Sequence, residues 1–373
     1  MQILNGYELD EVAWKAKGGG GMCNIATKDG KKFFIKKMLY PKYPVSSKFS
    51  DDYISEKIEE CDAWLRYRKK IISSLPGDGQ GNLVKPIEYF RDGATYYEVA
   101  YCIDDNGSIP YDRMYAESEE TRARIMLTIS TVLEDMHNKG IVHGDLDPGN
   151  IFISRSTGGN LITKLIDFTD SFFADNPPES IMSKEYWWSP EVALYNQYEG
   201  KDNPFRKLLS CKADVFSLGI IFHQYCTEGG EGPKCTESRV WKELGKGNKP
   251  RINPSIEPRF KNLIESMLEL EPDNRPSMEE VHSTLLHILK PELKAAASKD
   301  VPVKTVVSSG GSLKAEPLGE TLVPGAGRRG NGSTVTNITQ LRNPRKIKVR
   351  FSNGEEQIYD LQFAIQQGFV ERR

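Results

Sequence analysis

The fold of this chain is decided by one stretch, His143-Gly144-Asp145-Leu146-Asp147-Pro148-Gly149-Asn150. A short apolar run, Ile151 to Ile153, follows it, and Leu165-Ile166-Asp167-Phe168-Thr169 lies a little further on. Asp, Pro, Gly and Asn gather in surface turns because their backbones or side chains favour turn conformations. The first stretch alone is therefore best interpreted as a surface turn, and residues further along the chain decide between a turn and a chemical site.

Three more motifs stand downstream in a fixed order. They are Trp188-Ser189-Pro190-Glu191, Asp214-Val215-Phe216-Ser217-Leu218-Gly219 and Asp273-Asn274-Arg275-Pro276-Ser277. Together with the first two stretches, they resemble the C-lobe motifs of the protein kinase family, and this combination argues against a chance series of turns. The resemblance implies a buried ion pair between Glu191 and Arg275. It also implies that Asp214 bonds to the backbone of the catalytic loop.

The same resemblance assigns chemical roles to three residues. Phosphoryl transfer needs an aligned hydroxyl group and cations over the developing charge. Asp145 is the expected catalytic base, which accepts the proton of that hydroxyl. Asn150 and Asp167 are the expected ligands of Mg²⁺, a hard cation that selects oxygen ligands. ATP and Mg²⁺ are therefore the expected cofactors.

A glycine run near the start of the chain, from Gly18 to Ile25, resembles the glycine-rich loop that covers the ATP phosphates. Gly18 and Gly20 take its first two glycine positions, and Cys23 stands in the third. A glycine run alone is more often a flexible turn. Here a strand that ends in a lysine follows at a suitable distance, so Gly18, Gly20 and Ile25 are expected to contact ATP.

That lysine is Lys36, at the end of Phe33-Phe34-Ile35-Lys36. The segment looks like the family strand whose lysine pairs the phosphates and is oriented by a glutamate on a helix. Side chains alternate along a strand, so Lys37 faces the other way and is only the runner-up. Phe34 departs from the family, which prefers a small residue against the adenine.

The orienting glutamate is expected on the helix of the first lobe. Glu56, Glu59 and Glu60 are the candidates there, and Glu60 is favoured because apolar residues 63–65 follow it. The hinge is expected at residues 98–103, whose sequence resembles the last strand of the family's sheet. The expected adenine contacts are Tyr101, Ile103 and Phe152, with Ala100 as a small gatekeeper.

The resemblance implies the two-lobed protein kinase fold, α+β, with ATP in the cleft between the lobes. Residues 1–103 mix strand-like runs, at 33–37, 83–90 and 95–103, with a helix at about 51–74, which predicts a small antiparallel sheet. Residues 104–291 predict a mostly helical lobe. Its helical patterns lie at residues 117–140, 213–227, 259–270 and 278–289. The pattern at 213–227 is apolar almost all round, so that helix is expected to be buried.

The last part of the chain is not covered by the resemblance. Residues 292–343 are rich in Gly, Ser, Pro, Thr and Val without periodicity, which predicts a flexible linker. Residues 344–373 predict a small β-hairpin-like appendage, with Asn353-Gly354 as its turn. A locally basic stretch is formed by Arg328, Arg329, Arg342, Arg345, Lys346, Lys348 and Arg350. They offer a docking surface for a protein partner, although a solvated charge run is the favoured interpretation.

Three departures from the family bear on regulation. Gly144 replaces the arginine that normally receives a phosphorylated activation segment, so activity is expected not to depend on such phosphorylation. Thr169 replaces a glycine after Asp167, which disfavours a flip of the backbone there. Asp147 stands where serine/threonine kinases carry a lysine, and Lys184 stands where they carry a threonine. One hypothesis is that these two pair, and the alternative is two independent solvated charges.

Composition limits the remaining function classes. The chain carries 52 acidic and 50 basic residues, a net charge of −2, so no nucleic-acid partner is expected. Its six cysteines form no close pairs of the metal-binding kind. No apolar run approaches the length of a membrane span, which predicts a cytoplasmic protein that does not use a membrane.

Serine or threonine on a protein substrate is the expected phosphate acceptor, and two other function classes compete. A pseudokinase or scaffold that binds ATP would usually lack one of Lys36, Asp145, Asn150 and Asp167, and all four are present. A small-molecule phosphotransferase is suggested by residues 143–145 and 148–150, which resemble aminoglycoside-type kinases. Those relatives lack the three downstream motifs. Tyrosine specificity stays open, because residues 184–189 match neither protein-substrate class well.

Overall fold

A computed structural model describes residues 2–11, 13–17, 21–45, 50–77, 79, 81–103, 107–199 and 202–290, and five shorter stretches, 322–324, 335–340, 346–352, 356–360 and 370–372. Residues Met1–Val301 form one compact unit, and Pro302–Arg373 form a second. Gly18 and Gly20, two of the expected ATP contacts, lie outside the described residues.

The first lobe is built on an antiparallel sheet with the strand order β1-β2-β4-β5-β8-β7, and β3 pairs with β4. Its strands are β1 (Ile3–Leu4), β2 (Tyr7–Leu9), β3 (Lys15–Lys17), β4 (Gly21–Lys28), β5 (Lys31–Lys42), β7 (Pro86–Asp92) and β8 (Thr95–Tyr101). Asp29 and Gly30 join β4 to β5 with φ values of 50° and 72°. A tight hairpin turn of type I′ requires positive φ at both of its central residues.

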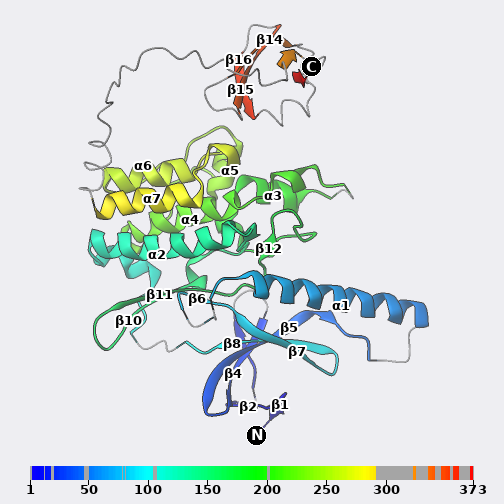
Figure 1. The fold of residues 1–373 in the computed structure, drawn as a ribbon. Coiled ribbons are helices and arrows are strands. Elements are labelled where there is room, and N and C mark those ends of the chain that lie inside the picture. Colours follow the sequence, from blue (N-terminus) through cyan, green and yellow to red (C-terminus); the bar gives the residue numbers. More distant parts are fainter. Residues whose placement is uncertain are drawn as a thin grey trace, which may run out of the picture. The chain divides into compact units, whose positions relative to one another are not determined.

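One helix, α1 (Asp51–Ser74), packs against this sheet, as the sequence predicts (Figure 1). Ser50 caps its first turn, because its hydroxyl oxygen accepts a hydrogen bond from the Tyr53 N–H. The Trp64 ring lies 5.6 Å from the Tyr89 ring of β7 and 5.1 Å from the Tyr96 ring of β8. These aromatic contacts fix which face of α1 meets the sheet.

The strand expected from residue 83 to residue 90 is divided in two. Pro86 has no N–H to donate, so it begins β7 rather than continuing the strand before it. That earlier piece, β6 (Leu83–Val84), pairs in parallel with β11 (Leu161–Ile166), which also pairs with β10 (Ile151–Arg155). The first hundred residues therefore contribute a strand to the second lobe, next to the strand that ends just before Asp167.

The second lobe is mostly helical, as predicted. Its helices are α2 (Glu119–His137), α3 (Pro190–Gln197), α4 (Lys212–Tyr225), α5 (Val240–Gly245), α6 (Pro258–Met267) and α7 (Met278–Leu289). Short 3-10 helices lie at Tyr111–Ala116, Pro148–Asn150, Glu185–Trp187, Pro204–Leu208, Glu228–Gly230 and Pro272–Asn274. Helices α2, α4, α6 and α7 stack on one another (Figure 1). Twelve of the 14 residues of α4 are buried, so the predicted buried helix is confirmed.

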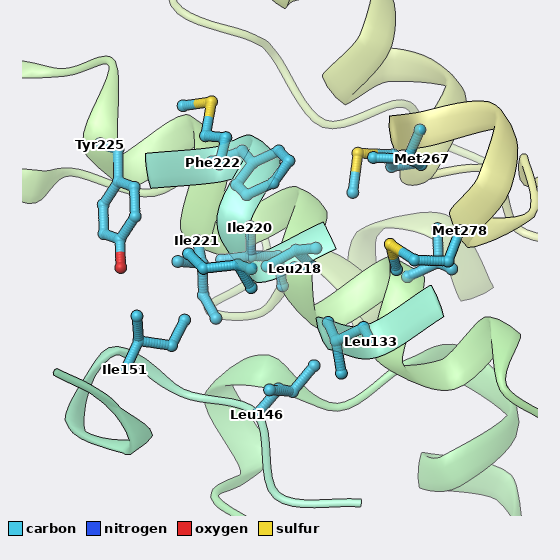
Figure 2. Packing of buried hydrophobic residues seen from close by; sticks show 14 of the residues in the cluster. Leu133, Leu146, Ile151, Leu218, Ile220, Ile221, Phe222, Tyr225, Met267 and Met278 are labelled. Carbon is cyan, nitrogen blue, oxygen red and sulfur yellow. The ribbon is translucent and has the colours of Figure 1, made fainter. Parts of the chain in front are cut away.

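The core of this lobe anchors the loop at residues 143–150 both within the loop and directly after it. Leu146, inside the loop, is 3% exposed, and Ile151, directly after it, is 6% exposed. Figure 2 shows both side chains in the same cluster as Leu133 of α2 and Ile221 of α4. Burying aliphatic side chains of this size stabilises a fold by roughly 1.5–3 kcal/mol each. The polar residues between Leu146 and Ile151 are therefore presented by a packed scaffold.

The C-terminal unit has more strands than the sequence predicts. The hairpin strands are β15 (Lys346–Phe351) and β16 (Glu356–Asp360), and residues 353–355 between them lie outside the described part. A third strand, β14 (Val335–Gln340), pairs with β15, and β13 (Leu322–Pro324) pairs with β17 (Val370–Arg372). Strands thus occupy part of the expected linker at 292–343. A two-stranded hairpin is marginal alone, and β14 supplies the third strand that an isolated sheet needs.

The described helices include none that joins the length and the apolar character needed to cross a bilayer.

Candidate active site

Two rows of side chains run across the first-lobe sheet and share one face. The first row is Ile25, Phe34, Ala100 and Pro86, and the second is Cys23, Lys36, Glu98 and Tyr89. Residues directly opposite one another on antiparallel strands place their side chains on the same side of a sheet. The first row lines a cavity, and Glu98 of the second row lines it too.

The cavity has a volume of about 370 Å³, within the range of small-ligand sites. The four expected adenine-site residues that the structure describes all line it: Ile25, Tyr101, Ile103 and Phe152. Phe34 and Ala100 face each other across β5 and β8 and line it too. The unusual phenylalanine is thus placed opposite a very small residue, which leaves room for a planar ring.

Lys36 and Asp167 form an ion pair beside this cavity. Lys36 Nζ lies 2.9 Å from Asp167 Oδ1 and 3.0 Å from Asp167 Oδ2, and it also donates to Thr169 Oγ1 at 3.0 Å. Burial alone would lower the pKa of Lys36, but Asp167 and Glu98 outweigh it and hold that pKa above its ordinary value. Lys37 points to the other face, where its Nζ lies 5.8 Å from the centre of the Trp14 ring. The runner-up lysine is therefore on the wrong side of the sheet.

The structure does not place Glu60 beside Lys36, which corrects the prediction for the orienting glutamate. Glu60 Oε2 instead accepts a hydrogen bond from Lys57 Nζ at 2.5 Å, and about a third of each side chain is exposed. The buried residues of α1 are Cys61, Arg68 and Ile71, whereas Glu60 is only part-buried. Apolar residues 63–65 do not mark one face of the helix, because successive residues are rotated by about 100° from one another.

Asp145 lies in the catalytic loop with Asn150 turned toward it. Asn150 Nδ2 donates to the Asp145 carbonyl oxygen at 2.7 Å and to Asp145 Oδ2 at 3.1 Å. The other carboxylate oxygen, Asp145 Oδ1, is buried and has no hydrogen-bond partner among the described residues. Burial, with Asp170 and Asp147 nearby, raises the pKa of Asp145 to about 7. A buried carboxylate that titrates near neutral pH is a typical general base.

Asp214, at the start of α4, holds the backbone of this loop. Its Oδ2 accepts the His143 N–H at 2.7 Å, and its Oδ1 accepts the Gly144 N–H at 3.1 Å. The His143 side chain is fully buried, and its Nε2 donates to the Ile166 carbonyl oxygen at 3.2 Å. The backbone contacts implied for Asp214 are therefore present and connect the loop to α4, while the His143 ring connects it to the strand before Asp167.

Gly144 is required by the local backbone. Its φ is +80°, a conformation that side chains strongly disfavour. A Cβ atom there would lie 2.7 Å from the Asp170 carbonyl oxygen and 3.1 Å from the Phe172 ring. The family's arginine therefore has no room at this position, and its absence follows from the close approach of the loop to residues 170–172.

Lys184 and Asp147 form an ion pair, as one hypothesis from the sequence proposed. Lys184 Nζ lies 2.6 Å from Asp147 Oδ2, and the Asp147 side chain is 3% exposed while that of Lys184 is 48% exposed. Asp147 Oδ1 also accepts the Gly149 N–H at 2.6 Å, which fixes the turn before Asn150. Burial and neighbouring carboxylates raise the pKa of Asp145, and the positive charge of Lys184 offsets part of that rise.

The buried ion pair implied for Glu191 and Arg275 is also present. Arg275 Nη1 and Nη2 donate to the two Glu191 carboxylate oxygens at 2.7 and 2.8 Å. Both side chains are almost fully buried, at 2% and 0% exposed. Such a fork geometry is the strongest form of this interaction. It joins α3 to the segment before α7 beneath the active site.

Three polar residues near Lys36 were missed by the sequence reasoning. Glu98 is 4% exposed in the second row of the sheet, Thr169 bonds to Lys36, and Arg68 of α1 donates to the Thr169 carbonyl oxygen. One signal was present for Glu98, because it is the only charged residue in the strand Thr95–Tyr101. The sequence offered no such signal for Arg68, which is one of several basic residues on its helix.

The donor set suits Mg²⁺ shared with phosphate. Asp167 offers carboxylate oxygens, and Asn150 has an amide oxygen on the side away from Asp145. Within the described residues, no three His, Cys, Asp or Glu side chains are grouped so that they could hold a metal by themselves. Mg²⁺ is commonly bound by one or two protein groups together with waters and substrate phosphates, so this set fits it.

Comparison with known proteins agrees with this geometry. Residues 20–286 match the family model of the protein kinase domain. Calcium-dependent protein kinase 27 of Arabidopsis thaliana is 30% identical over 327 residues, which cover 83% of this chain and 59% of that protein. The serine/threonine-protein kinase Nek5 of Homo sapiens is 23% identical over 286 residues, 74% of this chain and 36% of that protein.

A third relative is the serine/threonine-protein kinase ste20 of Emericella nidulans, which is 30% identical over 215 residues, 55% of this chain and 23% of that protein. This chain thus spans well under two thirds of the length of the curated relatives it matches. The family model, by contrast, covers both lobes and every motif of the cleft except the first glycines. On that match, the chain belongs to the family of protein kinase domains.

Proposed function

We propose that this chain is an active ATP-dependent protein kinase that transfers the γ-phosphate to serine or threonine hydroxyls of protein substrates. The observation that carries the proposal is that four residues meet at one cleft: Lys36, Asp145, Asn150 and Asp167. A kinase-like protein that only binds ATP would usually lack at least one of them. The serine/threonine preference rests on two relatives that are serine/threonine-protein kinases, Nek5 and ste20.

In this proposal each residue has one task. Lys36, beside the cavity, binds the ATP phosphates, and Asp167 and Asn150 hold Mg²⁺. Mg²⁺ bound with ATP neutralises charge that develops on the transferred phosphate. Asp145 accepts the proton of the substrate hydroxyl at Oδ1, the oxygen that has no partner among the described residues. Lys184, paired with Asp147, adds positive charge beside the same loop.

The proposal predicts how activity depends on pH. Burial first, then neighbouring carboxylates, raises the pKa of Asp145 to about 7, and only its ionised form can accept a proton. We therefore expect kcat/KM for a protein substrate to rise about tenfold per unit below pH 7 and to level off above it, because kcat/KM reports groups of the free enzyme. Steady-state rates between pH 5.5 and 9 measure this.

The Lys184→Gln variant supplies the matching test of that profile. Since Lys184 lowers the pKa of Asp145, its removal should move the midpoint of the profile to higher pH. Lys261→Gln, which removes a similar lysine from α6, should leave the midpoint where it is. A profile that stays flat between pH 6 and 8 in the unaltered protein would contradict the assignment of Asp145 as the titrating base.

Activity is proposed not to require phosphorylation of the activation segment. The start of that segment is held by unmodified groups: Ser171 Oγ donates to the His143 carbonyl oxygen at 3.0 Å, and Tyr67 of α1 donates to the Asn176 carbonyl oxygen at 2.9 Å. Strand β12 (Phe172–Phe173) also pairs with β9 (Ile141–Val142) beside the catalytic loop. Protein treated with a phosphatase should keep its activity, which mass spectrometry and rate measurements would verify together.

Transfer of label from γ-labelled ATP decides between this function and its rivals. The purified chain, with Mg²⁺ and a generic protein substrate such as casein, should give phosphoserine or phosphothreonine on acid hydrolysis. Phosphotyrosine would overturn the serine/threonine preference. ATP binding without any transfer would favour a pseudokinase, and label on an added aminoglycoside but not on protein would favour a small-molecule phosphotransferase.

Two further parts of the proposal concern the cell. A cytoplasmic location is proposed from the composition, and fractionation of the source cells tests it. An acidic protein partner is proposed for the basic C-terminal stretch, in which Arg350 is exposed. Pull-down from lysate with the full chain, compared with the chain ended at residue 290, tests this, and equal recovery of all partners would refute the docking role.

A further inference from the structure

A buried carboxylate that the proposed mechanism does not use lies beside Lys36. Glu98 of β8 is 4% exposed and stands directly opposite Lys36 of β5. On its other side, Tyr89 of β7 is opposite Glu98 and donates its hydroxyl to Glu98 Oε2 at 2.5 Å. Burying a carboxylate costs free energy unless hydrogen bonds and opposite charge offset the cost. Its position next to the phosphate-binding lysine therefore calls for a functional explanation.

Thr169 links this carboxylate to the lysine. Thr169 Oγ1 accepts a hydrogen bond from Lys36 Nζ at 3.0 Å, and it lies 3.2 Å from Glu98 Oε2 and 2.8 Å from Asp167 Oδ1. A hydroxyl group has one proton, so Thr169 can donate to only one of the two carboxylates at a time. Lys36, Thr169 and Glu98 thus form a continuous chain of polar contacts that includes no residue of α1.

Helix α1 brings a cation to this place instead of a carboxylate. Arg68 is 7% exposed, and its Nη1 donates to the Thr169 carbonyl oxygen. Burial raises the pKa values of Tyr89 and Asp170, and the positive charge of Arg68 offsets part of both rises. The described hydrogen bonds of Lys36 go to Asp167 and Thr169. The negative charges near Lys36 are those of Asp167, Glu98 and Asp170. The helix therefore supports the segment around Thr169 rather than the lysine itself.

We propose that Glu98, acting through Thr169, is the positioning residue of Lys36, in the place that a helix glutamate would otherwise take. The inference rests on the proposed function in one respect, namely that Lys36 binds the ATP phosphates. Asp167 would be shared with Mg²⁺ if it holds that ion, and the link through Thr169 to Glu98 would then keep the Lys36 side chain in place. Because β5 and β8 are neighbouring strands, the register of the sheet fixes the lysine and the carboxylate side by side.

Binding measurements that need no phosphate transfer test this proposal, so a failure of the proposed activity does not obscure it. The probes are the β,γ-imido analogue of ATP with Mg²⁺, and adenosine, which lacks phosphates. Glu98→Gln keeps the volume and an oxygen that can accept from both Tyr89 and Thr169, but it removes the negative charge beside Lys36. We expect it to weaken the analogue roughly tenfold, because a hydrogen bond to a neutral oxygen stabilises less than one to a charged carboxylate, and to change adenosine binding less than twofold.

A double-mutant cycle separates a positioning role from a merely structural one. In a Lys36→Met background, Glu98→Gln should weaken the ATP analogue no further, because the residue through which Glu98 acts is gone. An undiminished effect in that background would overturn the proposal. So would an equal loss of adenosine and analogue affinity, because a damaged sheet affects both ligands alike.

Two more comparisons keep the test decisive if Glu98→Gln folds poorly. Thr169→Ser keeps the linking hydroxyl and should retain the affinity for the analogue, whereas Thr169→Val keeps the shape, loses the hydroxyl and should weaken the analogue selectively. Glu60→Gln removes the carboxylate that the sequence favoured. If Glu60→Gln weakens the analogue more than Thr169→Val does, the helix glutamate orients Lys36 after all and the proposal fails.

Discussion

Replacing Asp145 with asparagine is expected to lower kcat by about 10²- to 10⁴-fold, the usual contribution of a positioned general base. Asparagine has the same shape and can still accept the hydrogen bond from Asn150 at the oxygen that replaces Oδ2. It cannot take a proton from a substrate hydroxyl. Initial rates of transfer from γ-labelled ATP to casein, with the variant and the unaltered protein side by side, measure the loss.

The same substitution should not harm the fold, and this separates a catalytic loss from a damaged protein. The raised folded-state pKa of Asp145 means that its ionised form destabilises the fold at pH values above about 7. Asparagine removes that buried charge, so the variant should melt at or above the temperature of the unaltered protein at pH 8. A buried carboxylate that costs stability is typical of a functional site.

Asp135→Asn is the matched control, because Asp135 is exposed on α2 of the same lobe. It should change neither the rate nor the melting temperature. An Asp145→Asn variant that keeps more than about a tenth of the rate would show that Asp145 is not the base, since even modest general-base catalysis is worth more. A variant that loses activity together with thermal stability would mean that Asp145 is needed for structure.

The sequence predicted those parts of the fold that local periodicity determines. The helix expected at 51–74 matches α1, and the continuous apolar run near 213–227 matches the buried α4. Strand pairing was less accessible, because it depends on residues far apart in the chain. Leu83 and Val84 read as the start of a longer strand, but they pair with Leu165 and Ile166, some eighty positions away. Strand β14 was not predicted, because it lies in a segment without apolar periodicity.

The candidate site was predictable wherever its residues lie within one loop. Asp145 and Asn150 are five positions apart, and the distance between their side chains follows from the turn that Asp147 caps. Orientation on the helix was not predictable to the same accuracy, since choosing Glu60 rather than a neighbour needs the rotation of α1 against the sheet. Aromatic packing of Trp64 sets that rotation, and it involves Tyr89 and Tyr96 from two strands. The roles of Glu98 and Thr169 could not be predicted either, because they depend on the strand register that places Glu98 opposite Lys36.

The glycine before Asp145 shows why a departure from the family can follow from the local structure. In the sequence, Gly144 stands where the family has an arginine, and this difference suggested a different mode of regulation. In the structure it is also a position where φ is +80° and where any Cβ atom would meet the Asp170 carbonyl oxygen. The loop at residues 143–150 and the activation segment approach each other too closely for an arginine side chain at position 144. The same approach allows Ser171 to bond to the His143 carbonyl oxygen.

Arg275→Met is expected to lower the free energy of unfolding by about 3–5 kcal/mol, the cost of removing one partner from a buried ion pair. Glu191 is 2% exposed and would stay behind as an uncompensated charge. The loss extends beyond the pair, because Arg275 also donates to the carbonyl oxygens of Glu269, Lys212 and Leu270 at 2.8 to 2.9 Å. Urea unfolding followed by tryptophan fluorescence measures the change.

An exposed ion pair on α1 gives the matched control for Arg275→Met. Arg66 and Glu59 on α1 lie 2.6 Å apart, but their side chains are 64% and 73% exposed. Arg66→Met should therefore change stability by less than about 1 kcal/mol. Adding Glu191→Gln to Arg275→Met should recover part of the loss, since it removes the stranded charge, while the three carbonyl oxygens still lack their donor. Full recovery would show that those carbonyl contacts contribute nothing, and no recovery would show that the loss does not come from the stranded Glu191 charge.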